Sequence, residues 1–134
     1  MGIKILPVIF VVLISCIQSV SFTSLQGTFT GRIPCADCPG INVHLTLRGD
    51  SVYNLLWQYL ERNVEFSDSG KWGIKESNGD KIILLDSKSS HQKTYYLIDN
   101  VNNIEMLGNN KKRIDNGLNY TLHRVRSSVR TRRR

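Results

Sequence analysis

The feature that most constrains this 134-residue chain is the strict alternation of apolar and polar residues in the segment INVHLTL, residues 41–47. In an extended strand, this alternation places all the aliphatic side chains on one face and the polar ones on the other. Shorter or less regular apolar segments follow along the chain, separated by turn residues such as the Asn-Gly-Asp of residues 78–80. The expected strands are residues 27–33, 41–47, 52–61, 67–74, 81–86, 93–99, 102–107 and 119–125.

No segment shows a convincing helical period, and the segment YNLLWQYLERN is predicted as a strand because of its aromatic residues and flanking turns. About eight short strands at this spacing indicate an all-β fold, either a sandwich or an up-and-down antiparallel β-barrel. The aromatic side chains expected to point inward either pack as core or line a ligand pocket, and core packing is favoured: Phe29, Tyr53, Trp57 and Trp72.

The positive charge of the chain is concentrated at its ends. Lys4 and the six arginines of residues 124–134 account for seven of the 18 basic residues, and the remaining 11 balance the 11 acidic residues. A neutral body without a basic face argues against nucleic-acid binding. Residues 126–134 are expected to be a disordered basic tail, which is either simply solvated or in contact with anionic lipid head groups or an acidic cell-wall polymer.

The N-terminus has the pattern of a targeting segment. A short positive start is followed by an apolar run of residues 5–14, which is shorter than the roughly 20 residues that span a bilayer. The run ends in Leu-Ile-Ser-Cys, which resembles the lipobox of bacterial lipoproteins. We therefore expect residues 1–15 to be a lipoprotein signal peptide, Cys16 to be lipidated, and residues 16–25 to form a tether. The alternative is an ordinary signal peptide that is cleaved slightly later.

Cys35 and Cys38 form a Cys-Ala-Asp-Cys motif in the stretch RIPCADCPGI. Structural zinc needs four ligands, and no second cysteine pair or histidine pair supplies them. A thioredoxin-like site needs a helix after the motif, which this pattern does not predict. Two readings remain open. The pair either forms a disulfide, which an exported chain favours, or in its reduced state binds Cu(I), which is soft and tolerates few ligands.

No catalytic constellation stands out, and the chain is predicted not to be an enzyme. The three histidines are expected to be surface residues: His44, His91 and His123.

The stretch from residue 27 to 47 resembles the N-terminal domain of the NlpE family of copper-homeostasis and envelope-stress outer-membrane lipoproteins. The residues that match the family pattern are Gly27, Phe29, Gly31, Pro34, Cys35, Ala36, Asp37, Cys38, Gly40 and Ile41. The resemblance covers residues 26–125 and only the N-terminal domain of the family, since the larger members carry a second, OB-like domain with its own cysteine pair. It implies a small lipocalin-related barrel with the Cys-x-x-Cys motif after its first strand.

The resemblance also implies a function. We expect a lipid-anchored protein of the outer membrane, facing the periplasm or the surface, that acts in copper homeostasis, envelope-stress sensing or both. Its expected partner is a periplasmic-facing sensor kinase, and copper is a candidate ligand of Cys35 and Cys38. Pro34, Asp37, Pro39 and Gly40 are expected to shape the loop, with Asp37 either bonding a backbone N–H or solvated. A small-molecule or lipid-binding barrel and a purely structural envelope lipoprotein are the alternatives.

Overall fold

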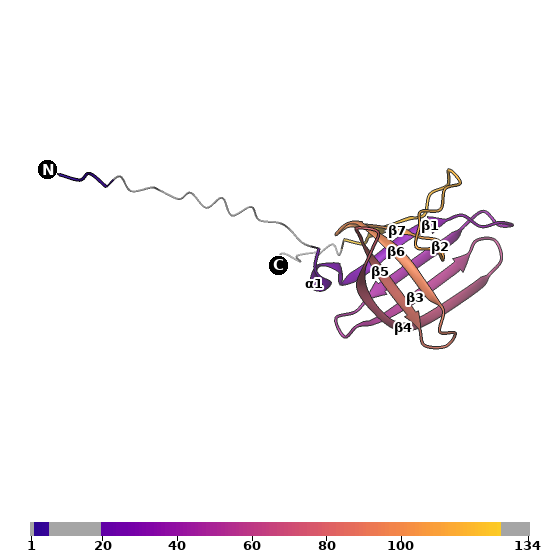
Figure 1. Cartoon of the computed structure of the whole chain (residues 1–134). Coiled ribbons are helices and arrows are strands. Elements are labelled where there is room, and N and C mark those ends of the chain that lie inside the picture. The colour runs from indigo at the N-terminus through magenta and orange to yellow at the C-terminus, as the bar shows by residue number, and fades with distance from the viewer. Residues whose placement is uncertain (1, 6–19, 127–134) are drawn as a thin grey trace, which may run out of the picture.

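The eight strands form one closed antiparallel barrel in which each strand pairs with its neighbours in sequence and the last strand pairs with the first (Figure 1). The computed structural model describes residues 2–5 and 20–126. The elements are α1 (Phe22–Leu25), β1 (Gly27–Ile33), β2 (Ile41–Leu47), β3 (Val52–Tyr59), β4 (Val64–Ser77), β5 (Asp80–Ser87), β6 (Lys93–Asn100), β7 (Asn103–Met106) and β8 (Thr121–Arg124). The prediction of an all-β, up-and-down barrel of about eight strands is therefore confirmed.

The alternation of β2 determines which of its faces points into the barrel. Its four aliphatic side chains are buried, whereas His44 between them is exposed. The core is completed by inward residues of the other strands, among them Phe29, Tyr53 and Trp72, which are nearly inaccessible to solvent. Burying one such large side chain contributes about 1.5–3 kcal/mol. These three aromatic residues therefore serve as core, and Trp57 alone of the four named above stays half-buried.

The β4–β5 hairpin closes with the predicted turn. Asn78 and Gly79 both adopt left-handed backbone angles, with φ of 52° and 82°. Two successive left-handed residues are what a two-residue type I′ turn requires, and Asn followed by Gly is the pair that adopts them most readily.

Because the strands run alternately up and down, the connections divide between two ends of the barrel. One end, here called the α1 end, carries α1 and the β2–β3, β4–β5 and β6–β7 turns. The opposite end, here called the loop end, carries the β1–β2, β3–β4, β5–β6 and β7–β8 connections. Seven residues of β1 separate the two ends along one strand, which is roughly 23 Å at about 3.3 Å per residue.

The structure differs from the expected tether at residues 20–25. Phe22–Leu25 form one helical turn with a reciprocal capping box between Ser21 and Ser24. The Phe22 ring stacks on Trp72 with centroids 4.2 Å apart, and Leu25 is fully buried. Two apolar side chains three residues apart lie on one face of a helical turn, so this segment packs on the barrel.

The remaining N-terminal predictions fall mostly outside the described residues. Residues 2–5 have no regular secondary structure, and the lipidation residue Cys16 and the tail beyond residue 126 lie outside the described part. No helix within the described ranges is both long enough and apolar enough to cross a bilayer.

Arg124 links the last strand of the barrel to the first elements of the fold at the α1 end. Its guanidinium donates hydrogen bonds to the carbonyls of Ser24, Gln26 and Val101, at 2.6–3.0 Å, and lies 4.7 Å from the centroid of the Phe29 ring. Burial lowers the pKa of Arg124 from its ordinary value. The side chain thus ties the last strand to α1, to β1 and to the β6–β7 turn.

Candidate functional site

The Cys35–Cys38 motif lies in the β1–β2 connection at the loop end of the barrel. The two sulfur atoms form a disulfide with a Cα–Cα distance of 5.3 Å. The loop starts and ends at Ile33 and Ile41, which pair across the strands and are both buried, so its base rests on the core. Both cysteines are half-buried and pack against the same core cluster.

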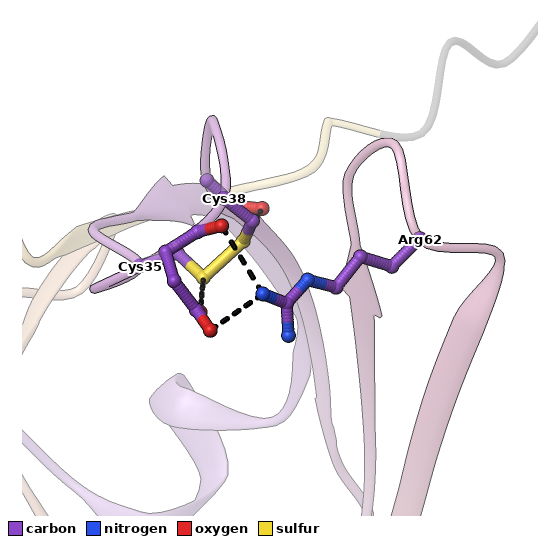
Figure 2. A network of polar contacts seen from close by, with 5 residues as sticks. Cys35, Cys38 and Arg62 are labelled. Carbon is purple, nitrogen blue, oxygen red and sulfur yellow. Dashed lines mark hydrogen bonds and ion pairs between the residues drawn. A yellow bond between two sulfur atoms is a disulfide. The ribbon is translucent and has the colours of Figure 1, made fainter.

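Asp37, between the two cysteines, contacts Arg62 of the β3–β4 turn (Figure 2). The Arg62 Nη2 atom lies 2.5 Å from the Asp37 carboxylate and donates a second hydrogen bond of 3.1 Å to the Asp37 carbonyl. These contacts connect the cysteine loop to a turn 25 residues away in the sequence. Both side chains are largely exposed, so the ion pair adds at most about 1 kcal/mol to stability.

Each sulfur atom faces an oxygen atom of its own loop. Cys35 Sγ is 3.7 Å from Asp37 Oδ1, and Cys38 Sγ is 3.3 Å from the Gly40 carbonyl oxygen. The disulfide carries no S–H, so these are contacts rather than hydrogen bonds. After reduction, each S–H group, which is a weak donor, could donate to the oxygen atom that it already faces.

The remaining predicted loop residues lie around the disulfide, and their loop-shaping role stays a prediction. Gly40 is buried, and its carbonyl accepts a hydrogen bond from Leu60 N–H. Its φ is 157°, and a Cβ atom at this position would lie 2.9 Å from the Arg32 side chain. Pro34 and Pro39 border the disulfide on either side. Asp37 contacts Arg62 rather than a backbone N–H, a partner that no local sequence signal indicated.

The donor atoms around the motif decide how it can hold a metal. Among residues 2–5 and 20–126, no group of three or more His, Cys, Asp or Glu side chains is placed to hold an ion. His44, on the exposed outer face of β2, therefore does not join the two sulfur atoms. The motif fits Cu(I) only after reduction, when two thiolates become available to a soft ion that accepts low coordination.

His44 and His123 flank Thr30 on the outer face of the barrel, and His91 lies in the β5–β6 connection. Within the described part of the chain, no hydrogen bond joins the ring of any of them to a hydroxyl or a thiol. All three are exposed, and the Nδ1 atom of His123 lies 2.6 Å from Asn103 Oδ1 rather than beside a hydroxyl or thiol. That the chain is not an enzyme stays a prediction.

Comparison with known proteins identifies close relatives. A family model described as the NlpE N-terminal domain matches residues 29–117. Lipoprotein NlpE of Escherichia coli (strain K12) is 32% identical over 112 residues, which are 84% of this chain and 46% of that protein. The 17 kDa lipoprotein of Treponema pallidum (strain Nichols) is 30% identical over 88 residues, which are 61% of this chain and 56% of that protein. This chain thus spans about half the length of the curated relatives it matches.

Two crystal structures share the fold at recognisable sequence identity. A Shewanella oneidensis protein matches with a TM-score of 0.62 and 33% identity, covering 78% of this chain and 94% of that one. The E. coli NlpE structure, described as the Cpx pathway activator, matches with a TM-score of 0.56 and 30% identity, covering 76% of this chain and 52% of that one.

Proposed function

The chain belongs to the NlpE N-terminal domain family, and from this membership we propose that it is a lipid-anchored envelope protein whose Cys35–Cys38 loop responds to copper or redox stress. By analogy with the E. coli relative described as the Cpx pathway activator, it signals envelope stress to a periplasmic-facing sensor kinase. Its proposed location is the outer membrane.

The observation that carries the proposal is the position of the cysteine loop relative to the start of the barrel. The chain enters the barrel through α1, at the end opposite to the β1–β2 connection. Cys16 lies four positions before Val20, the first described residue of the segment that leads into the barrel. A lipid on Cys16 would hold the α1 end near the membrane and leave the Cys35–Cys38 loop on the far side, where a partner can reach it.

The chemistry of the loop gives it two states. As a disulfide, Cys35 and Cys38 have no thiolate to offer a metal. As dithiols, they would hold one Cu(I) through two soft sulfur ligands, which suits copper handling. Arg62, which contacts Asp37 between the cysteines, provides a route by which a change in the loop reaches the β3–β4 turn.

A Cu(I) titration of the full-length protein tests the site. Reduced wild-type protein should bind about one Cu(I) per chain with a competing Cu(I) chelator present, while oxidised wild type and the Cys35→Ser/Cys38→Ser variant should bind none. His44→Ala is a matched control, because this exposed donor lies outside the loop, and it should bind like the wild type. Equal binding by the double cysteine variant would contradict the copper assignment.

Two cellular measurements test the remaining parts. Palmitate labelling of wild type but not of Cys16→Ala supports the anchor, whereas an unlabelled wild type overturns it. A stress-pathway reporter should respond to overproduced wild type and lose that response in the double cysteine variant; an unchanged response would mean that signalling does not use this pair.

A further inference from the structure

The inner face of the β3–β4 hairpin remains partly uncovered at the loop end. β5 pairs with β4 only from Gly70 onward, so residues 64–69 of β4 extend past their neighbouring strand. The face of the hairpin that points into the core nearer the α1 end extends to the loop end as three cross-strand pairs: Leu55 with Asp68, Trp57 with Phe66, and Tyr59 with Val64. Leu55 is buried. Phe66 and Val64 lie on the same inward face of the hairpin, yet they are 50% and 51% exposed.

A cavity of about 220 Å³ lies against this face. Three aromatic rings form much of its wall, with Phe66 and Tyr59 each packed edge-to-face on Trp57 at centroid distances of 6.1 and 6.5 Å. Among the described residues, Asp68 is the one charged residue that lines the cavity, and no lysine, arginine or histidine does so. Neutral polar residues of β5, β6 and the loop between them complete the lining.

The Asp68 carboxylate is held in a defined orientation. Tyr53 donates a hydrogen bond of 2.6 Å to one of its oxygens, and Ser87 donates one of 2.8 Å to the other. Each oxygen of an ionised carboxylate can accept more than one hydrogen bond, so both retain capacity toward the cavity. Asp68 itself is half-buried, which reduces solvent screening of its charge.

We propose that this cavity binds a small organic cation, an ammonium compound that sits against the rings of Trp57, Tyr59 and Phe66 and is neutralised by Asp68. Aromatic ring faces attract ammonium groups through their quadrupole, and the carboxylate adds a formal countercharge. An anionic ligand would meet Asp68 with no basic residue among the described lining residues of this cavity to offset the repulsion. A purely apolar ligand would leave the charge of Asp68 uncompensated.

The size of the cavity limits the ligand class further. A volume of about 220 Å³ accommodates ammonium compounds of the size of choline or ethanolamine.

Calorimetric titration of the full-length protein tests the proposal with choline, ethanolamine and 3,3-dimethylbutan-1-ol, the uncharged isostere of choline. We expect at least one of the two cations to bind with a dissociation constant of about 1 mM or tighter, and the isostere to bind at least about tenfold more weakly. Equal or tighter binding of the isostere, or no binding of either cation, would overturn the proposal.

Two variants locate the site. Asp68→Asn should weaken cation binding at least about tenfold, while Glu65→Gln removes an equal charge from the opposite, outward face of the same strand and should change the affinity less than about twofold. If Asp68→Asn does not fold, as judged by circular dichroism, Phe66→Leu removes a half-exposed ring and should weaken binding by a similar factor. Unchanged binding in a folded site variant would overturn the assignment.

Discussion

Replacing Arg124 by methionine should destabilise the barrel far more than the position of this residue in a four-residue terminal strand suggests. The substitution keeps an unbranched apolar stem but removes the donors to the carbonyls of Ser24, Gln26 and Val101 and the charge over Phe29. A hydrogen bond to a charged group contributes about 1.5–3 kcal/mol, and a partly exposed cation–π contact about 0.5–1 kcal/mol. Because Arg124 is only half-buried, water replaces part of this, and we expect a net loss of about 3 kcal/mol.

Urea unfolding followed by circular dichroism measures this loss. For a domain of this size, about 3 kcal/mol corresponds to a fall in Tm of roughly 10–20 °C. Arg124→Lys keeps the charge but not the planar array of donors, so it should recover less than half of the loss. Arg113→Met is the matched control, because its ion pair with Glu105 is 3.4 Å long and largely exposed on the arginine side, and it should cost less than about 0.5 kcal/mol.

A loss below about 1 kcal/mol for Arg124→Met, or a loss equal to that of Arg113→Met, would refute this reasoning. It would mean that the apolar contacts of α1 and β1 alone stabilise the α1 end. The hydrogen bonds of the Arg124 guanidinium would then add no net stability over the hydrogen bonds that it makes to water in the unfolded chain.

Close packing at Gly70 and the burial of Tyr53 and Tyr96 have measurable consequences. Gly70→Ala should cost about 2–3 kcal/mol or more in urea unfolding, because a Cβ atom there would meet the Asp86 carbonyl oxygen, whereas Gly73→Ala in the same strand meets nothing within 4 Å and should stay within about 0.5 kcal/mol of wild type. Tyr96→Phe removes a buried hydroxyl that has no hydrogen-bond partner among the described residues, and it should stabilise the barrel by about 1 kcal/mol. Tyr53→Phe removes a hydrogen-bond donor to Asp68 and should destabilise the barrel by about 1–2 kcal/mol. Burial raises the pKa of Tyr53 and Tyr96, and at Tyr53 the neighbouring Asp68 carboxylate raises it further. Because the unfolded chain loses these protons from about pH 10 while the folded state keeps them, the stability of the fold should fall as the pH rises above about 10. A Tm that is flat from pH 9 to pH 12 would contradict this.

The parts of the fold that the sequence predicts are those that depend on local patterns. The alternation in residues 41–47 identifies both the strand β2 and its buried face, because side chains alternate between faces in any extended strand. The Asn78–Gly79 turn is equally local, because these residues readily adopt the left-handed angles of a tight hairpin.

The parts that the sequence does not predict depend on which segments meet in space. Arg62 contacts Asp37 because β2 pairs with β3 in a register that brings Ile41 opposite Tyr59, and neither residue signals this alone. β4 begins at Val64 rather than at the predicted residue 67, because residues 64–66 gain their strand partners only from the end of β3. Phe22, which was predicted to be part of the tether of residues 16–25, stacks on Trp72, fifty residues away in the sequence.

The redox state of Cys35 and Cys38 in intact cells tests the central proposal most directly. Thiol trapping with a mass-tagged maleimide, with and without added copper, reports the state of the pair; Cys16→Ala provides a form whose only cysteines are these two. We expect a disulfide in unstressed cells. When a thiol reductant, added alone or with copper, supplies the two electrons and two protons that open the disulfide, we expect a measurable reduced fraction that correlates with reporter activity. A pair that remains fully oxidised under every condition while the reporter still responds would contradict it.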